Sequence, residues 1–139
     1  MIGTLRMTAS GMHRSTDLAS KVRVVGPEVV SRTDEEIVIA LPTDRPLLFT
    51  RLGPDDLRRD GCFVSFYSDL VARRHSQIVF ERGVFWLHDL SSSGGSYVNG
   101  VRLSRARQLH DGDVIEVGAY QLRFERRQTP TDMSSKDAG

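Results

Sequence analysis

Short runs of apolar residues, most of them β-branched or aromatic, alternate with turn residues along most of the chain. In the last of these runs Leu122 and Phe124 alternate with Gln121 and Arg123, which is the period of a strand that buries one face. The expected strands are residues 22–25, 36–41, 47–52, 63–67, 77–80, 84–87, 114–117 and 121–124. Strands this short and this regularly interrupted predict an all-β fold, a two-sheet β-sandwich.

Turn residues and local composition predict how the chain is organised. Residues 81–83, Glu-Arg-Gly, separate two expected strands and indicate a hairpin in which the glycine supplies a positive φ. Residues 55–59 are the only segment that favours a helical turn. Residues 1–20 and 127–139 are polar and without period, so we expect two disordered tails around one domain of residues 21–126.

Composition and charge narrow the classes of function. The chain has 139 residues, 39% hydrophobic and 27% charged, which suits one globular domain, and its formal net charge of +1 gives no general attraction to a polyanion. Cys62 is the only cysteine, so an internal disulfide and a cysteine-rich metal site are excluded, and the histidines lack metal-ligand spacing. No apolar stretch has the length of a signal peptide or a membrane span, so we expect an intracellular protein, cytoplasmic or nuclear, with no membrane partner.

A run of small residues, Ser-Ser-Ser-Gly-Gly-Ser at positions 91–96, lies between two strand-like segments. A Walker-type phosphate loop would continue with Lys-Ser or Lys-Thr, and a nucleophile elbow would have glycine where Val98 stands, so the sequence predicts no enzyme. A rigid loop at the end of a sandwich can instead bring backbone N–H groups and hydroxyls close to a ligand. Arg51, Arg73 and Arg74 lie in other segments and indicate that this ligand carries a phosphate, because guanidinium binds phosphate oxygens in pairs.

Four segments, in order along the chain, resemble those of a known family. They are Thr50-Arg51, Ala72-Arg73-Arg74-His75, the stretch from Asp89 to Gly100 and the stretch from Gly112 to Gly118. Together they resemble the forkhead-associated (FHA) domain, whose fold is a two-sheet β-sandwich. The resemblance implies a phosphothreonine-peptide-binding module that mediates phosphorylation-dependent protein–protein interaction as a signalling adaptor. It implies a threonine-phosphorylated partner protein, an upstream Ser/Thr kinase, and no cofactor or metal.

The resemblance also assigns roles to individual residues. Arg51 is implied to contact the phosphate itself, since arginine and a phosphate dianion form charge-assisted hydrogen bonds. The residues implied to bind the phosphopeptide are Arg51, Ala72, Arg73, Ser93 and Gly94. Further candidate contacts to the peptide are Arg74 and Ser92, and the residues implied to brace the loops are His75, Ser96 and Asn99.

Two departures from the family pattern lower the expected affinity. Ala72 stands where the family has a serine whose hydroxyl bonds the phosphate, and losing such a bond costs about 1.5–3 kcal/mol, roughly 10- to 150-fold in affinity. Gly94 replaces an asparagine that holds the peptide backbone, a further loss of about 0.5–1.5 kcal/mol. We therefore expect a reader that is weakened, or specialised for a particular peptide.

Two other functions stay open at this point. The same fold could serve as a phosphate-independent interaction module, which both departures favour. Nucleic-acid binding through the arginines would depend steeply on salt, but few aromatic residues interleave with them, which argues against a nucleic-acid partner. The spacing of residues 66–75 is similar to that of FHA domains in fungal RING-type ubiquitin ligases, although the chain has no RING cysteines.

Overall fold

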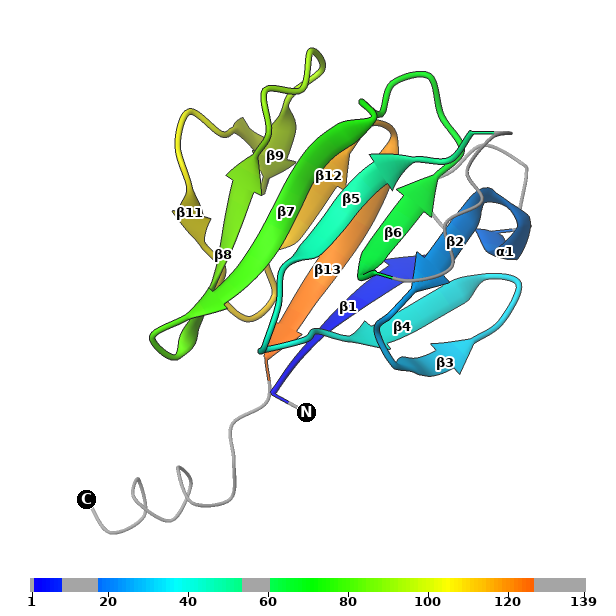
Figure 1. Ribbon diagram of the computed structural model, residues 1–139, viewed down its shortest axis with the longest axis horizontal. Coiled ribbons are helices and arrows are strands. Elements are labelled where there is room, and N and C mark those ends of the chain that lie inside the picture. The colour runs from blue at the N-terminus through cyan, green and yellow to red at the C-terminus, as the bar shows by residue number, and fades with distance from the viewer. Residues whose placement is uncertain (1, 9–17, 54–60, 127–139) are drawn as a thin grey trace, which may run out of the picture.

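The computed structural model describes residues 2–8, 18–53 and 61–126. It contains two β-sheets packed face to face, so the all-β sandwich expected from the sequence is confirmed (Figure 1). The seven-stranded sheet contains, in spatial order, β10 (Val101–Arg102), β9 (Ser96–Val98), β12 (Val114–Val117), β13 (Tyr120–Arg126), β1 (Gly3–Thr8), β4 (Glu36–Ala40) and β3 (Val29–Arg32). The six-stranded sheet contains β11 (Arg107–Gln108), β8 (Val84–Asp89), β7 (Arg74–Glu81), β5 (Leu47–Arg51), β6 (Phe63–Phe66) and β2 (Val22–Val25).

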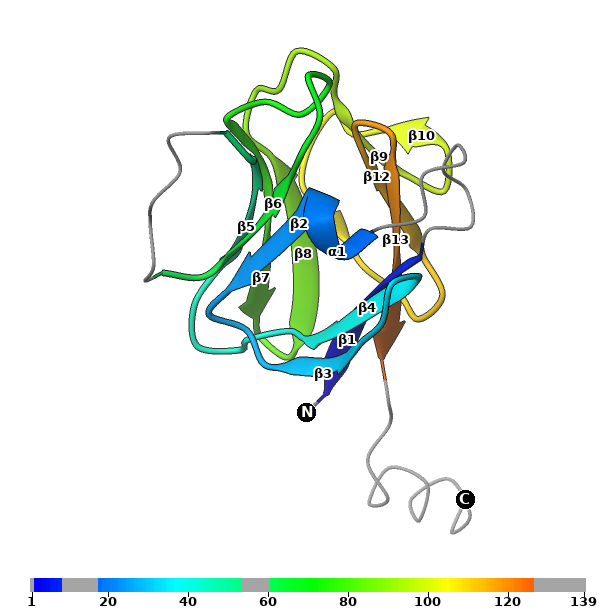
Figure 2. The ribbon, with the colours of Figure 1, turned by 90° about the vertical axis from the view of Figure 1, so that its right-hand side faces the viewer.

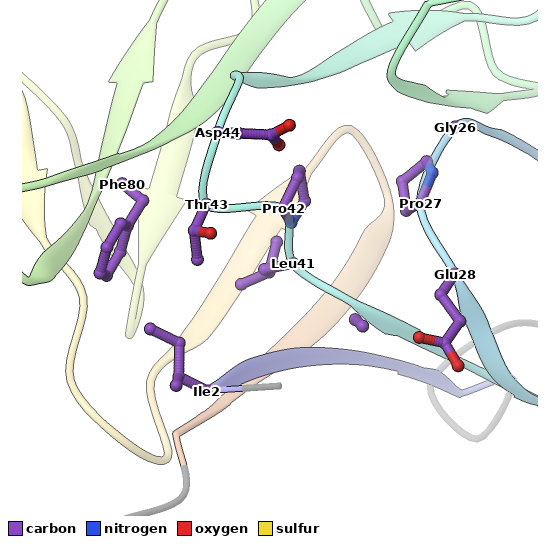
Figure 3. A pocket seen from close by; sticks show the side chains of 10 residues that line it. Ile2, Gly26, Pro27, Glu28, Leu41, Pro42, Thr43, Asp44 and Phe80 are labelled. Atoms are coloured by element: carbon purple, nitrogen blue, oxygen red, sulfur yellow. The ribbon is translucent and has the colours of Figure 1, made fainter.

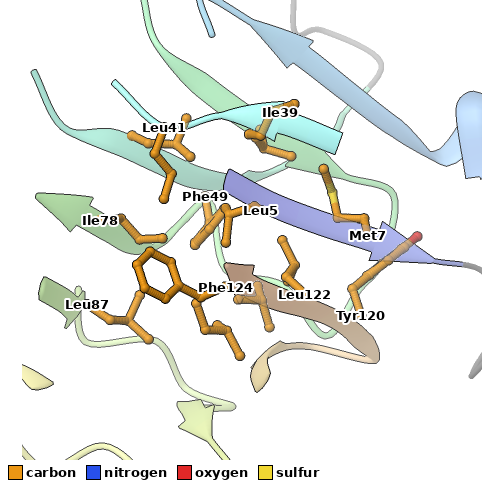
Figure 4. Packing of buried hydrophobic residues seen from close by; sticks show 14 of the residues in the cluster. Leu5, Met7, Ile39, Leu41, Phe49, Ile78, Leu87, Tyr120, Leu122 and Phe124 are labelled. Atoms are coloured by element: carbon orange, nitrogen blue, oxygen red, sulfur yellow. The ribbon is translucent and has the colours of Figure 1, made fainter. Parts of the chain in front are cut away.

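Alternate residues of the strands face a common core between the sheets, as the sequence pattern predicts. In β13, Leu122 and Phe124 are buried, whereas Gln121 and Arg123 are exposed. The ring of Phe124 lies 5.4 Å, centroid to centroid, from the ring of Phe85 on the opposite sheet, and Figure 4 shows side chains of both sheets meeting in this layer. The core therefore fixes the strands from whose ends the loops extend.

The hairpin expected at residues 81–83 is confirmed. Arg82 and Gly83 connect β7 to β8 with φ values of 54° and 83°, both positive, as the tight turns of twisted hairpins require. The segment 55–59, for which the sequence favours a helical turn, lies outside the described residues. The described part contains a one-turn helix elsewhere, α1 (Leu18–Lys21).

The expectation of a disordered tail over residues 1–20 is wrong for Gly3–Thr8, which form β1. This strand pairs with β13 on one side and with β4 on the other, inside the seven-stranded sheet. Leu18, the first residue of α1, is also buried. Residues 9–17 and 127–139, the rest of the two expected tails, lie outside the described residues.

The physical reason for this correction lies in non-local pairing. Leu5 and Met7 of β1 are buried in the core, and Arg6 between them pairs on the outer face with Glu36 at 2.8 Å and with Glu125 at 3.3 Å. Apolar and polar residues alternate in β1, but its glycine and threonines make the hydrophobic pattern weak. The partner strands come from distant parts of the chain. A local interpretation of the sequence therefore misses this strand.

The two ends of the sandwich differ in what they present. Figure 1 shows the β6–β7 and β8–β9 loops together at one end, with the C-terminal end of β5 beside them. The β7–β8 turn, the start of β1 and the end of β13 lie at the opposite end (Figures 1 and 2). No helix among the described residues is long and apolar enough to span a membrane.

Candidate functional site

Three exposed arginines stand at the loop-bearing end of the six-stranded sheet. Arg51 is the last residue of β5, Arg74 is the first residue of the neighbouring strand β7, and Arg73 directly precedes that strand. The register pairs Thr50 with Arg74, so Arg51 and Arg74 lie on adjacent strands. The buried hydroxyl of Thr50 lies 2.6 Å from that of Ser65, which ties β5 to β6 beneath them. All three side chains are exposed, and no ion pair joins them to another residue that the structure describes.

His75 joins the two loops beside these arginines. Its side chain is fully buried, and its Nδ1 atom accepts a hydrogen bond of 2.9 Å from the N–H of Ala72 in the β6–β7 loop. The proton of the ring is therefore on Nε2, which donates to the carbonyl oxygen of Gly95 in the β8–β9 loop at 2.8 Å. Both ring nitrogens are thus occupied by backbone groups, and the ring holds the loops in a fixed relation.

Asp89, the last residue of β8, orders the small-residue loop that follows it. Its Oδ1 atom accepts hydrogen bonds from the hydroxyls of Ser92 at 2.5 Å and Ser96 at 2.6 Å, and its Oδ2 atom accepts the N–H of Ser92 at 3.1 Å. Burial alone would raise the pKa of the Asp89 carboxyl, but these hydrogen bonds outweigh burial and the pKa is lowered. Ser92 and Ser96 therefore point inward, and Ser93 and Gly94 are left exposed at the loop tip.

The tip of the β8–β9 loop packs closely against two neighbours. A Cβ atom on Gly94 would lie 3.4 Å from the carbonyl oxygen of Leu70, so the tip touches the β6–β7 loop. Gly95 has a φ of 81°, and a Cβ atom there would lie 2.6 Å from Nε of Arg102. The Arg102 Nη2 atom also donates to the carbonyl oxygen of Ser93 at 3.5 Å. Glycine at position 95 thus allows an arginine of β10 to lie across the loop.

Arg102 is a neighbour of this loop that the sequence pattern did not predict, although one signal in the sequence indicates it. The Asn99-Gly100 pair makes a tight turn between β9 and β10, and such a pair is a strong hairpin signal. That turn pairs Arg102 with Tyr97, next to the small-residue loop. Leu70 was not predicted as a neighbour either, because its contact with the loop tip joins two loops that lie apart in the sequence.

Asn99 lies in the turn after β9, the strand that follows the small-residue loop. Its Oδ1 atom accepts the N–H of Val114 at 2.9 Å, and its Nδ2 atom donates to Oδ1 of Asp113 at 2.9 Å. Asp113 Oδ2 in turn accepts the N–H of His110 at 2.8 Å. These bonds join the β9–β10 turn to the start of β12, so the strand that follows the small-residue loop is anchored at its far end.

Two exposed apolar side chains border the arginines on the β6–β7 loop. Tyr67 and Leu70 are 65% and 63% exposed, values that make them accessible to a ligand. The hydroxyl of Tyr120 donates to the carbonyl oxygen of Tyr67 at 2.8 Å, which fixes the start of this loop on the opposite sheet. The loop end therefore combines fixed backbone, exposed guanidinium groups and apolar surface. Within residues 2–8, 18–53 and 61–126, no group of three or more His, Cys, Asp or Glu side chains could hold a metal ion.

The structure thus brings the expected site residues to one end of the molecule and separates them into two kinds. Exposed at this end are Arg51, Arg73, Arg74, Ser93 and Gly94, with Ala72 half-buried among them. Buried or bonded within the loops are His75, Ser92, Ser96 and Asn99. The first kind can meet a ligand, whereas the second kind holds the loops in place.

Comparisons with known proteins bear on the family and the fold of the chain. The model of the FHA domain matches residues 51–118. A probable E3 ubiquitin-protein ligase, dma1 of Schizosaccharomyces pombe, is 34% identical over 66 residues, which are 43% of this chain and 25% of that protein. The E3 ubiquitin-protein ligase DMA1 of Saccharomyces cerevisiae is 29% identical over 123 residues, 83% of this chain and 29% of that protein. The chain therefore spans less than a third of the length of these curated relatives.

Solved structures show the same fold at low sequence identity. The FHA domain of an Arabidopsis thaliana hypothetical protein has a TM-score of 0.58 and 16% identity, covering 94% of this chain and 90% of that chain. An FHA domain structure solved to study phosphothreonine-dependent FHA domain interactions has a TM-score of 0.56 and 20% identity, covering 93% of this chain and 100% of that chain. The MEK1 FHA domain, in complex with a phosphothreonine peptide of HOP1, has a TM-score of 0.51 and 21% identity, covering 73% of this chain and 95% of that chain.

Proposed function

The chain belongs to the FHA domain family, whose members are protein-interaction modules, and on this premise we propose that it binds partner proteins phosphorylated on threonine. The observation that carries the proposal is the set of exposed guanidinium groups of Arg51, Arg73 and Arg74 beside the exposed loop tip of Ser93 and Gly94. A phosphate dianion gains charge-assisted hydrogen bonds from such groups, and a rigid loop adds backbone N–H donors. The phosphothreonine peptide bound by the MEK1 FHA domain, which has the same fold, supports the same ligand class.

In this proposal Arg51 and Arg73 bind the phosphate and Ser93 donates a hydroxyl. Arg74 contacts acidic side chains of the peptide, and such an outer charge mainly raises the association rate. Ser92 is bonded to Asp89, and this bond favours a scaffolding role over the peptide contact considered from the sequence. His75, Ser96 and Asn99 hold the loops.

The proposed affinity is lower than that of an FHA domain with the full family pattern. Ala72 offers no hydroxyl, and Gly94 offers no side-chain amide to the peptide backbone. Arg73 directly follows Ala72 and compensates in part for the missing hydroxyl, because its guanidinium can bind two phosphate oxygens. A specialised peptide, with apolar residues placed for Tyr67 and Leu70, would regain further affinity.

We further propose that this chain has no enzymatic activity of its own and needs no cofactor. The ligase names of the yeast relatives describe proteins more than three times as long as the stretches they share with this chain. A zinc-binding RING needs several cysteines, whereas Cys62 is the only cysteine of this chain. A ligase activity would therefore come from sequence outside it. Because phosphothreonine is produced by Ser/Thr kinases, the proposal also places the chain inside the cell.

The experiment that tests the proposal is a screen of the protein against an oriented phosphothreonine peptide library, with matched phosphoserine and unphosphorylated libraries. We expect selection from the phosphothreonine library alone. The second candidate function is a phosphate-independent interaction module, which Ala72 and Gly94 favour. Equal selection from all three libraries, or from none, would reject the proposed reader and leave this second candidate.

A further inference from the structure

A groove opens at the end of the sandwich opposite Arg51, Arg73 and Arg74. It has a volume of about 490 Å³ and lies among the start of β1, the β2–β3 turn, the β4–β5 connection and the end of β7 (Figure 3). We name it the distal groove. Its lining residues are Ile2, Gly26, Pro27, Glu28, Ala40, Leu41, Pro42, Thr43, Asp44 and Phe80. A volume of this size, within the roughly 300–1,000 Å³ of typical ligand sites, accommodates several side chains of a peptide.

The lining of the distal groove combines apolar side chains with the carboxylates of Glu28 and Asp44. Figure 3 shows Ile2 and the ring of Phe80 toward one end and the carboxylate of Glu28 toward the other, with Asp44 on the rim between them. Carboxylates accept hydrogen bonds and donate none. The lining set contains no lysine, arginine or histidine. An occupant that complements this surface therefore offers an apolar side chain together with a cationic donor.

The walls of the distal groove are held in place by the fold. Leu41 donates its N–H to the carbonyl oxygen of Gly3 at 2.8 Å, and Ala40 donates to the carbonyl oxygen of Glu28 at 2.9 Å. The ring of Phe80 lies 4.7 Å from the ring of Phe85 in the core. Because these contacts fix the walls before an occupant arrives, binding costs little ordering of the protein.

The surface beside the distal groove suits an extended chain. The edge strand β3 begins directly after Glu28 and lies at the margin of the seven-stranded sheet. Val29 and Val30 of this strand are 39% and 45% exposed, which is high for valine in a sheet. An edge strand leaves backbone N–H and C=O groups free for another strand.

We propose that the distal groove and the edge of β3 bind an extended, unphosphorylated segment of a partner protein that carries an apolar and a basic side chain two residues apart. In a strand, residues i and i+2 point to the same side, so both side chains can enter the groove together. The apolar side chain lies against Leu41 and Phe80, and the basic side chain lies against Glu28 and Asp44. Charge complementarity thus selects a basic peptide over an acidic one.

This inference goes beyond the proposed phosphothreonine site and does not depend on it, because the distal groove shares none of its residues. A partner that carried both features, separated by enough chain to pass along the sandwich, would bind through two weak contacts. Linking two such contacts raises the overall affinity, because the second binding event becomes intramolecular.

The test uses the full ¹⁵N-labelled chain and three nine-residue peptides of glycine and serine. One carries leucine and, two residues later, arginine; the second has glutamate for the arginine, and the third has alanine for the leucine. With the leucine–arginine peptide at up to millimolar concentration, we expect amide shifts at Glu28, Leu41 and Asp44. We expect a roughly fivefold or greater loss of affinity in the double variant Glu28→Gln, Asp44→Asn, because two charge pairs are removed.

Controls separate a specific site from general attraction to acidic surface. Glu35→Gln removes an exposed carboxylate that does not line the groove, and we expect affinity within twofold of that of the unchanged chain. The glutamate and alanine peptides should each bind more weakly than the leucine–arginine peptide. No shifts in the groove, equal affinity for the glutamate peptide, or equal losses from Glu35→Gln and the double variant would overturn the inference.

Discussion

The Nε2 atom of His75 donates to the carbonyl oxygen of Gly95 at 2.8 Å, while Nδ1 of the same ring accepts the N–H of Ala72 at 2.9 Å. One buried side chain therefore fixes the backbone of two loops that are separated in the sequence. The exposed arginines and the small-residue tip stand on either side of this link. Their relative position depends on a residue that need not touch any ligand.

We expect His75→Ala to lower the free energy of unfolding by about 2–4 kcal/mol, because it removes two hydrogen bonds and leaves buried polar groups and a cavity. Urea unfolding measures this loss. The matched control is His88→Ala, whose ring is partly rather than fully buried and should cost less than about 1 kcal/mol. Similar small losses in both variants would show that His75 does not join the loops.

Gly94 and Gly95 should respond in opposite ways to a side chain. At position 94 a Cβ atom meets only the Leu70 carbonyl oxygen at 3.4 Å, so Gly94→Asn should fold normally. At position 95 the φ of 81° and the 2.6 Å approach to Arg102 make Gly95→Ala costly, by about 1–3 kcal/mol. Thermal unfolding compares the two variants, and equal stability would contradict the loop geometry.

Ala72→Ser should strengthen phosphothreonine binding, because it restores a hydroxyl at a position that the family uses for the phosphate. The expected gain is roughly tenfold or more, the value of one hydrogen bond to a charged group. Fluorescence anisotropy with a phosphothreonine peptide measures it. Ala119→Ser, which adds a hydroxyl at an exposed turn, is the control and should leave the affinity unchanged. A gain that is equal for the unphosphorylated peptide would contradict the assigned contact.

The ionised form of Asp89 should stabilise the protein in a pH-dependent way. The folded state lowers the pKa of Asp89 below its ordinary value of 3.8, so this stabilisation is present above pH 3.8 and is lost as the pH falls through the folded-state pKa. The difference in unfolding free energy between the unchanged chain and Asp89→Asn should therefore be constant from pH 7 to pH 5 and shrink below pH 3.8. Urea titrations at pH 6 and pH 3 compare the two proteins, and a difference that stays constant would contradict the role of the Ser92 and Ser96 hydroxyls.

Sequence reasoning predicted the parts of the fold that depend on local patterns. The alternation around Leu122 and Phe124 predicted β13, and the turn at Arg82 and Gly83 predicted the β7–β8 hairpin. It missed β1, because this strand is defined by pairing with β4 and β13 rather than by its own composition. The sheet order is likewise a property of pairing between distant segments.

For the candidate site, spacing placed the arginines and the small-residue run in separate segments, but it did not give the contacts between loops. The approach of Gly94 to Leu70 and of Gly95 to Arg102 follows from how loops pack at one end of the sandwich. The roles that the resemblance assigns to Arg51, Arg73 and Ser93 stay predictions, since they require a bound ligand. The distal groove left no signal in the sequence, because its lining comes from four separate segments.

The most direct test of the central claim is calorimetric titration of the best library-selected phosphothreonine peptide into the unchanged chain, Arg51→Ala and Arg45→Ala. Both variants lose one exposed arginine, but Arg45 lies in the β4–β5 connection, away from the loops. We predict that Arg51→Ala weakens binding by at least roughly tenfold, the value of a charge-assisted bond to phosphate, and that Arg45→Ala changes it by less than twofold. Equal affinities of the three proteins, or equal affinity for the unphosphorylated peptide, would contradict phosphothreonine recognition at this end of the sandwich.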